Sequence, residues 1–248
     1  MSPTGGPGAA GTGGEAGGGA GPGDGDAAGL PNLLVRAGQV FVAPGRLFGR
    51  LRDRPAWAGA LALAVAVAVA ATLLVPEELF REFMLSQMPA DAPADAVQSQ
   101  VDAQVRFRWV PPLVGMPLGA AITAGILLFI YNLLLGGEGR YRQLVAVSSH
   151  ALLIPAVGEM VTVPLRIQTQ SFETSLALHL LAPGLEEGFL LFFLQGLNVF
   201  ALWASVVIGV GVSRVYPRSS AGSASAVVVG LFLALAAGGA ALRAAFAG

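Results

Sequence analysis

Two ionisable side chains, His150 and Glu159, lie within the apolar stretch "LVAVSSHALLIPAVGEMVTVPL", residues 144–165. Ionisable groups in a membrane-length apolar segment can handle protons, ions or a polar solute. Their spacing of nine residues places them on opposite sides of an ideal helix. This geometry does not favour an acid–base pair or a shared metal ion. Pro155 lies between them and could reduce their separation by kinking the helix.

A structural role for these polar residues is the favoured alternative. In residues 144–165, one helix face carries Ser148, Pro155, Glu159 and Thr162, with Glu159 near the outer interface. A second apolar stretch, residues 189–212, carries Gln195, Asn198, Ser205 and Gly209 along one face. Asn132 and Gly125, in the apolar stretch at residues 113–135, indicate a helix-packing face more weakly. Small residues and side-chain amides are typical of helix–helix contacts in lipid. The pattern therefore predicts packing seams, and an ion or substrate pathway remains the second interpretation.

Signatures of enzymes are missing from the sequence. It contains no Walker loop, no HExxH and no GxSxG. The stretch "EELFR", Glu77 to Arg81, is similar to the EExxxR motif of CAAX-type intramembrane proteases but is one residue too short. The histidine motifs of those enzymes are also absent, because the chain has only His150 and His179. We predict no enzymatic activity, no catalytic, cofactor-binding or metal site, and no cofactor.

The composition indicates a membrane protein. Hydrophobic residues make up 54% of the chain and charged residues 12%, whereas soluble domains carry about 25% charged residues. A net charge of −1 provides no overall attraction to nucleic acid. There is no cysteine, which excludes disulfides and thiolate chemistry. The bilayer is the expected environment.

Five apolar stretches reach the length of about 20 residues that a membrane-spanning helix needs. Their periodicity is not that of an alternating β-barrel. We therefore predict an all-α, polytopic membrane protein with a five-helix bundle in residues 56–246. The expected spans are residues 56–75, 113–135, 144–165, 189–212 and 224–246.

Two segments precede this domain. Residues 1–29 are rich in Gly, Ala and Pro and are predicted to be a disordered tail. Residues 30–55 form a basic amphipathic segment that we expect to be broken or kinked at Pro44. A helix at the membrane surface is favoured over one packed on its own domain.

The distribution of arginines predicts the orientation. With five spans, one side of the membrane receives nine arginines and the other side five. Positive charge accumulates on the cytoplasmic side, so we expect a cytoplasmic N-terminus and an extracytoplasmic C-terminus in the cell (inner) membrane. Residues 76–90 and 94–110 are predicted to form two short helices on the outer side. The nine arginines are Arg36, Arg46, Arg50, Arg52, Arg54, Arg140, Arg142, Arg214 and Arg218.

Three loose motifs resemble the bacterial members of the YIP1 family. They are "P-x-x-L-F-x-x-L…R-P-x-W" at 44–57, "G-G-x-G-x-Y-R-Q-L…H-A-x-L-I-P" at 136–155 and "W-x-x-V-V-x-G-x-G-V-S" at 203–213. The resemblance covers about residues 33–246. It implies five transmembrane helices and the orientation given above. Eukaryotic members interact with Rab GTPases, but their "DLYGP"-like stretch is absent here, so that role is not carried over.

Two hypotheses for the function follow. The first is a non-enzymatic integral membrane protein of the YIP1 type, acting through helix-mediated association with membrane partners or a second copy, or by organising the membrane. The alternative is a small transporter or permease subunit that uses His150 and Glu159 within the membrane.

Overall fold

The computed structural model describes residues 29–89, 91–182 and 184–246, and the regular elements in this part of the chain are helices. Two extended residues, Ala177 and Asn198, form an isolated antiparallel bridge. The all-α prediction is therefore confirmed. Apart from Gly29, the predicted disordered tail lies outside the described residues.

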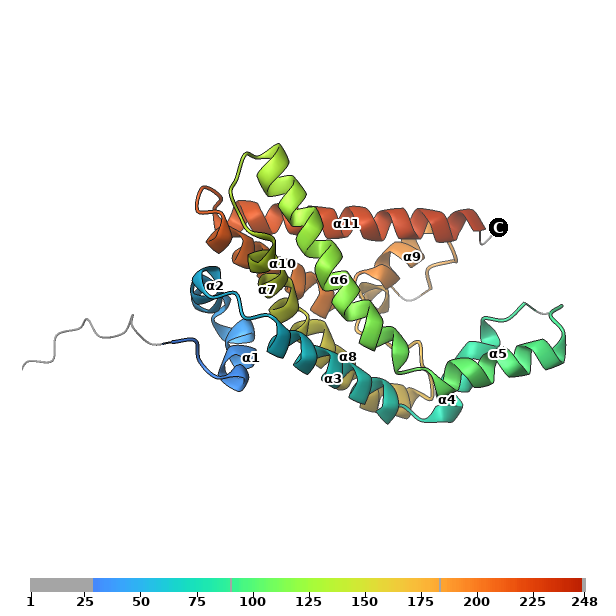
Figure 1. Ribbon diagram of the computed structural model, residues 1–248. Coiled ribbons are helices and arrows are strands. Elements are labelled where there is room, and N and C mark those ends of the chain that lie inside the picture. Colours follow the sequence, from blue (N-terminus) through green and yellow to red (C-terminus); the bar gives the residue numbers. More distant parts are fainter. Residues whose placement is uncertain (1–28, 90, 183, 247–248) are drawn as a thin grey trace, which may run out of the picture.

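The helices follow one another along the chain with short connections (Figure 1). The N-terminal half contains α1 (Leu33–Val42), α2 (Pro44–Asp53), α3 (Ala58–Leu74), α4 (Glu77–Ser86), α5 (Ala94–Arg106), α6 (Val110–Leu128) and the π-helix η1 (Phe129–Leu134). The C-terminal half contains α7 (Tyr141–Ala151), α8 (Leu153–Thr169), the short 3₁₀ helix η2 (Leu178–Leu181), α9 (Phe189–Gly196), α10 (Val199–Val215) and α11 (Ala221–Phe246).

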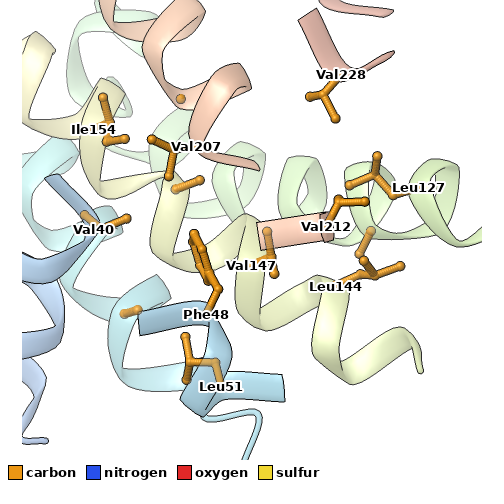
Figure 2. Close-up of a cluster of buried hydrophobic side chains, with 14 of the residues drawn as sticks. Val40, Phe48, Leu51, Leu127, Leu144, Val147, Ile154, Val207, Val212 and Val228 are labelled. Carbon is orange, nitrogen blue, oxygen red and sulfur yellow. The ribbon is translucent and has the colours of Figure 1, made fainter. Parts of the chain in front are cut away.

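The hydrophobic core lies where α2, α7 and α10 meet. Figure 2 shows Phe48 of α2 beside Val147 of α7, with Val207 and Val212 of α10 close by. Gly211 permits this close approach, because a Cβ atom there would lie 2.5 Å from a methyl group of Val147. α3 packs along α8, and α6 packs on α3 and α7.

Two long helices lie at the periphery. α6 crosses the body diagonally in Figure 1, and α11 runs along one side, in contact with α10 and α9. In each long helix we consider the most apolar window of 18 residues. Buried residues make up 17% of this window in α6–η1 and 11% in α11, compared with 61% in α7–α8. Most of the surface of α6 and α11 is therefore free to contact lipid or another protein.

The predicted number of spans is confirmed only in part. Within the described ranges, three helices are long and apolar enough to cross a membrane, namely Val110–Leu134, Tyr141–Thr169 and Ala221–Phe246. A fourth is reached if α3 and α4, which meet at an angle of 86°, count as one span. Five spans are not confirmed.

The predicted span at residues 189–212 is interrupted, which the apolar composition did not indicate. α9 ends at Gly196 and α10 begins at Val199. Between them, Asn198 is extended, and its side-chain oxygen accepts hydrogen bonds from the backbone N–H groups of Phe200 (2.8 Å) and Ala201 (3.4 Å). Asn198 is thus the N-cap of a new helix.

The amphipathic segment at 30–55 is broken at Pro44, as predicted. Pro44 is the first residue of α2, a position where its missing N–H costs nothing. The apolar face of α2 faces protein rather than lipid, because Leu47, Phe48 and Leu51 are at most 1% exposed. The preference for a surface helix was therefore wrong for α2, whose arginines remain exposed.

Candidate functional site

The structure separates the two ionisable residues of the predicted third span. His150 is fully buried near the end of α7, and its Nδ1 lies 2.8 Å from the carbonyl oxygen of Ala146. A carbonyl can only accept, so Nδ1 carries the proton. Glu159 lies on α8, is about half exposed and pairs with Arg166 at 3.0 Å.

These separate partners give no support to the transporter alternative. α7 and α8 are interrupted at Leu152, three residues before Pro155. Pro155 has no N–H to donate to the carbonyl of Ala151, which explains the interruption. The break does not create an interaction between His150 and Glu159.

Arg166, in the last turn of α8, fixes the end of this helix to the segment that follows it. Its Nε donates to the carbonyl oxygen of Thr174 (3.1 Å), and its guanidinium lies 4.9 Å from the centre of the Phe172 ring. Phe172 in turn stacks on Phe83. The polar residues of this helix are therefore used for packing within the chain.

The amides of the predicted fourth span also have partners within the chain. The side-chain oxygen of Gln195 accepts a hydrogen bond from Arg243 at 3.2 Å, and Asn198 caps α10. Ser205 donates to the carbonyl of Ala201, one turn earlier on its own helix. The polar seam thus stabilises the fold rather than remaining free for another protein.

A more elaborate polar arrangement lies at the end of α6, where the chain turns into α7. The Asn132 amide donates from Nδ2 to the carbonyl oxygen of Gly139 (2.8 Å) and accepts from the Gly139 N–H (3.0 Å). The hydroxyl of Tyr216, at the end of α10, donates to the same Asn132 oxygen at 2.7 Å. One amide therefore joins three segments. We call Tyr131, Asn132, Gly137, Gly139 and Tyr216 the Asn132 junction.

The π-helix η1 places the aromatic and amide side chains of this junction. An inserted π turn shifts the positions of side chains on a helix, and such turns occur frequently at functional sites. Here it contains both Tyr131 and Asn132. The ring of Tyr131 is buried and stacks on that of Tyr216 with a centroid distance of 4.9 Å.

Two glycines are required for this packing. A Cβ atom at Gly137 would lie 2.7 Å from the Tyr131 carbonyl oxygen and the Tyr216 ring. At Gly139 it would collide with the Tyr216 hydroxyl. The glycines of the "GGEGRYR" loop thus let the backbone pass against a tyrosine ring.

Burial keeps the Tyr216 hydroxyl protonated. Removal from water, together with a smaller electrostatic effect of the neighbouring Tyr131, raises the pKa of Tyr216 to about 12. The group is therefore a hydrogen-bond donor to Asn132 at physiological pH.

A hollow of about 300 Å³ opens beside the junction. Tyr131, Tyr216 and Gly137 form part of its wall, together with Arg52 from α2 and Arg218 from the α10–α11 loop. The hydroxyl of Tyr131 is buried and has no hydrogen-bond partner among the described residues. In the same part of the chain, no three His, Asp or Glu side chains lie close enough to share a metal ion. The arrangement is suited to recognition and to structural support.

Sequence reasoning missed the junction as a unit. The sequence pattern predicts a weak helix-packing role for Asn132, and Arg140 and Arg142 contribute only to the predicted orientation. Tyr216 lies just beyond an apolar run. The available signal was a polar amide near the end of one span and a tyrosine at the end of another.

Comparison with known proteins gives one match. Residues 38–242 match the family profile described as the Yip1 domain, which extends from α1 into α11 and includes the junction. No curated protein and no solved structure matches the chain. The matched domain and the apolar helices place the chain in a lipid bilayer.

Proposed function

Because the chain belongs to the Yip1 family, we propose that it is a non-enzymatic membrane protein that acts through association of its helices with membrane partners or with a second copy. The organisation of the surrounding membrane would follow from this association. The polar seams of the third and fourth predicted spans are used inside the fold, so the contact surface must lie elsewhere.

One exposed face of α6 and of η1, which continues it, carries this proposal. Leu118, Ile122, Phe129 and Leu133 are 57%, 52%, 54% and 69% exposed. Gly115 and Gly125 fall on the same face, so that successive residues are three, four, three, four and four positions apart. A Cβ atom at either glycine would meet nothing within 4 Å. We call these six residues the α6 stripe.

The α6 stripe has the features of a helix–helix contact in lipid. Apolar residues that repeat every 3.5 residues keep one face toward a neighbouring helix. Small residues within such a face allow two backbones to approach closely. Gly158, by contrast, is already packed against Phe200 within the bundle.

Thiol cross-linking in native membranes tests the proposal, because the chain contains no cysteine of its own. Ile122→Cys places the thiol on the stripe, and Ala124→Cys places it on the buried face of the same helix. With a short thiol-reactive photo-cross-linker, which needs no lysine on the neighbouring protein, the Ile122→Cys protein should form discrete adducts with a protein partner or a second copy. Equal yields from both variants, or adducts with lipid alone, would contradict the proposal.

We also propose an orientation. The protein lies in the cell (inner) membrane with its N-terminus in the cytoplasm and its C-terminus outside. The support is that three arginine-bearing segments meet at one end of the bundle. Gln143 of α7 donates to the Arg52 carbonyl of α2 (2.7 Å), and Arg214 of α10 lies against Gly45. Reporter fusions after Gly139 and after Glu173 should report cytoplasmic and outside locations, respectively.

A further inference from the structure

Two hollows adjoin at the arginine-rich end of the bundle. The first is the hollow of about 300 Å³ beside the Asn132 junction. The second, of about 310 Å³, lies between Arg52 and the start of α11. Arg52, Pro217 and Ser219 line both, so the two hollows are neighbours on either side of these residues.

The hollows are positively charged. Arg52 borders both, Arg218 borders the first and Arg214 the second, while Glu138 is the one carboxylate among the lining residues. Three positive groups against one negative group leave a net charge of +2. Within the described residues, the ion pairs involve Arg81 and Arg166, and none involves these three arginines.

One of the arginines lies against the backbone of α2. A Cβ atom at Gly45 would lie 2.9 Å from a terminal nitrogen of Arg214, so this guanidinium lies over the first turn of α2. Guanidinium groups present a planar set of donors that matches the oxygens of a phosphate. The three arginines come from α2 and from the end of α10 with the loop that follows it, so two parts of the chain bring them to the same pair of hollows.

Further donors line the same space. Tyr131 lines the first hollow, and its hydroxyl is buried and has no hydrogen-bond partner among the described residues. A buried donor without a partner is costly. Ser219 lines both hollows and adds a hydroxyl, whereas the hydroxyls of Ser213 and Ser220 at the second hollow already donate to the Val210 carbonyl oxygen (2.8 Å) and to Ser223 (3.0 Å).

An apolar surface begins at the edge of the first hollow. Leu135 lines it, and both Leu134 and Leu135 are exposed. A ligand with a phosphate and acyl chains could place its charge among the arginines and its chains along these leucines. From this combination we propose that Arg52, Arg214 and Arg218 bind the phosphate of an anionic phospholipid.

Native mass spectrometry of the whole chain in a neutral detergent tests this proposal, with phosphatidylglycerol as the probe and phosphatidylcholine as the neutral comparison. Arg52→Gln/Arg218→Gln should lower the affinity for phosphatidylglycerol by about tenfold or more, given the contribution of each basic residue near an anionic surface. Arg46→Gln/Arg50→Gln is the matched control, since both arginines are exposed on α2 and line neither hollow.

Two further arms separate the outcomes. Arg52→Lys/Arg218→Lys keeps the charges and should retain binding within about threefold, while thermal unfolding shows whether each variant is folded. Inorganic phosphate at millimolar concentration should displace the lipid only weakly, because it lacks the acyl chains. Equal loss in the test and control pairs would overturn the proposal. Tight binding of inorganic phosphate without lipid binding would also overturn it, in favour of a free phosphate ligand.

Discussion

The hydroxyl of Tyr216 lies 2.7 Å from the side-chain oxygen of Asn132, although 84 residues separate the two along the chain. This bond joins the end of α10 to the turn between α6 and α7. Because the same amide also holds Gly139 through two bonds, the position of the turn depends on a single side chain. The arginine-lined hollow opens beside it.

Replacing Asn132 should therefore destabilise the protein substantially. Asn132→Leu removes three hydrogen bonds and leaves the Gly139 N–H and C=O without their partner. We expect the free energy of unfolding in detergent to fall by about 2–3 kcal/mol, the cost of unsatisfied buried groups. Ser205→Ala is the control, because Ser205 bonds only within its own helix, and it should cost less than about 1 kcal/mol. Equal effects of the two substitutions would show that the junction does not organise the turn.

The raised pKa of Tyr216 predicts a pH dependence in the alkaline range. An unfolded tyrosine has a pKa near 10, and in the folded protein the pKa of Tyr216 is raised to about 12. The folded state thus holds the proton more tightly. Its contribution to stability is complete below about pH 10 and is lost as the pH rises toward 12.

Tyr216→Phe provides the comparison. It should lower the stability at pH 8 by about 1 kcal/mol through loss of the hydrogen bond, and it should weaken the decline in stability between pH 10 and 12. Thermal unfolding at several pH values measures both effects. A parallel decline in the wild-type and Tyr216→Phe proteins would contradict the assignment.

Gly139 and Gly119 should respond in opposite ways to alanine. The new methyl group at Gly139 would collide with the Tyr216 hydroxyl, so Gly139→Ala should cost about 1–3 kcal/mol. Gly119 lies within α6 and a Cβ there would meet nothing within 4 Å. Gly119→Ala should be neutral or stabilising by up to about 1 kcal/mol. A stabilising Gly139→Ala in the same unfolding assay would show that the loop does not pass against Tyr216.

Asn198 provides a test that distinguishes capping from assembly. Asn198→Leu removes the acceptor for two N–H groups and should lower stability by about 1 kcal/mol. Asn198→Asp retains an acceptor at the same position and should keep most of the stability. Neither substitution should change cross-linking through the α6 stripe. Loss of cross-linked species with normal stability would instead support an intermolecular role for Asn198.

Local features of the fold were predictable because they depend on local signals. The break before Pro44 follows from the chemistry of proline, and α4 and α5 follow from turn residues that separate two helical patterns. The apolar runs located the long helices to within a few residues.

The features that were not predicted depend on long-range contacts or on a single polar residue. Average hydropathy cannot show that Asn198 starts a new helix within an apolar run. The amphipathic pattern of α2 gives the same face whether that face meets lipid or protein, and only the packing against α10 and α7 decides. The bond between Asn132 and Tyr216 requires the ends of three helices to meet, which periodicity does not specify.

A photo-cross-linking scan along α6 in native membranes tests the central claim most directly. A photoreactive residue is placed at each position from Leu113 to Leu134 in turn, and adducts are identified by mass spectrometry. We predict protein adducts that recur with the spacing of Leu118, Ile122 and Phe129 and are absent at Ala120 and Ala124. Uniform yields along the helix, or adducts with lipid alone at every position, would contradict association through the α6 stripe.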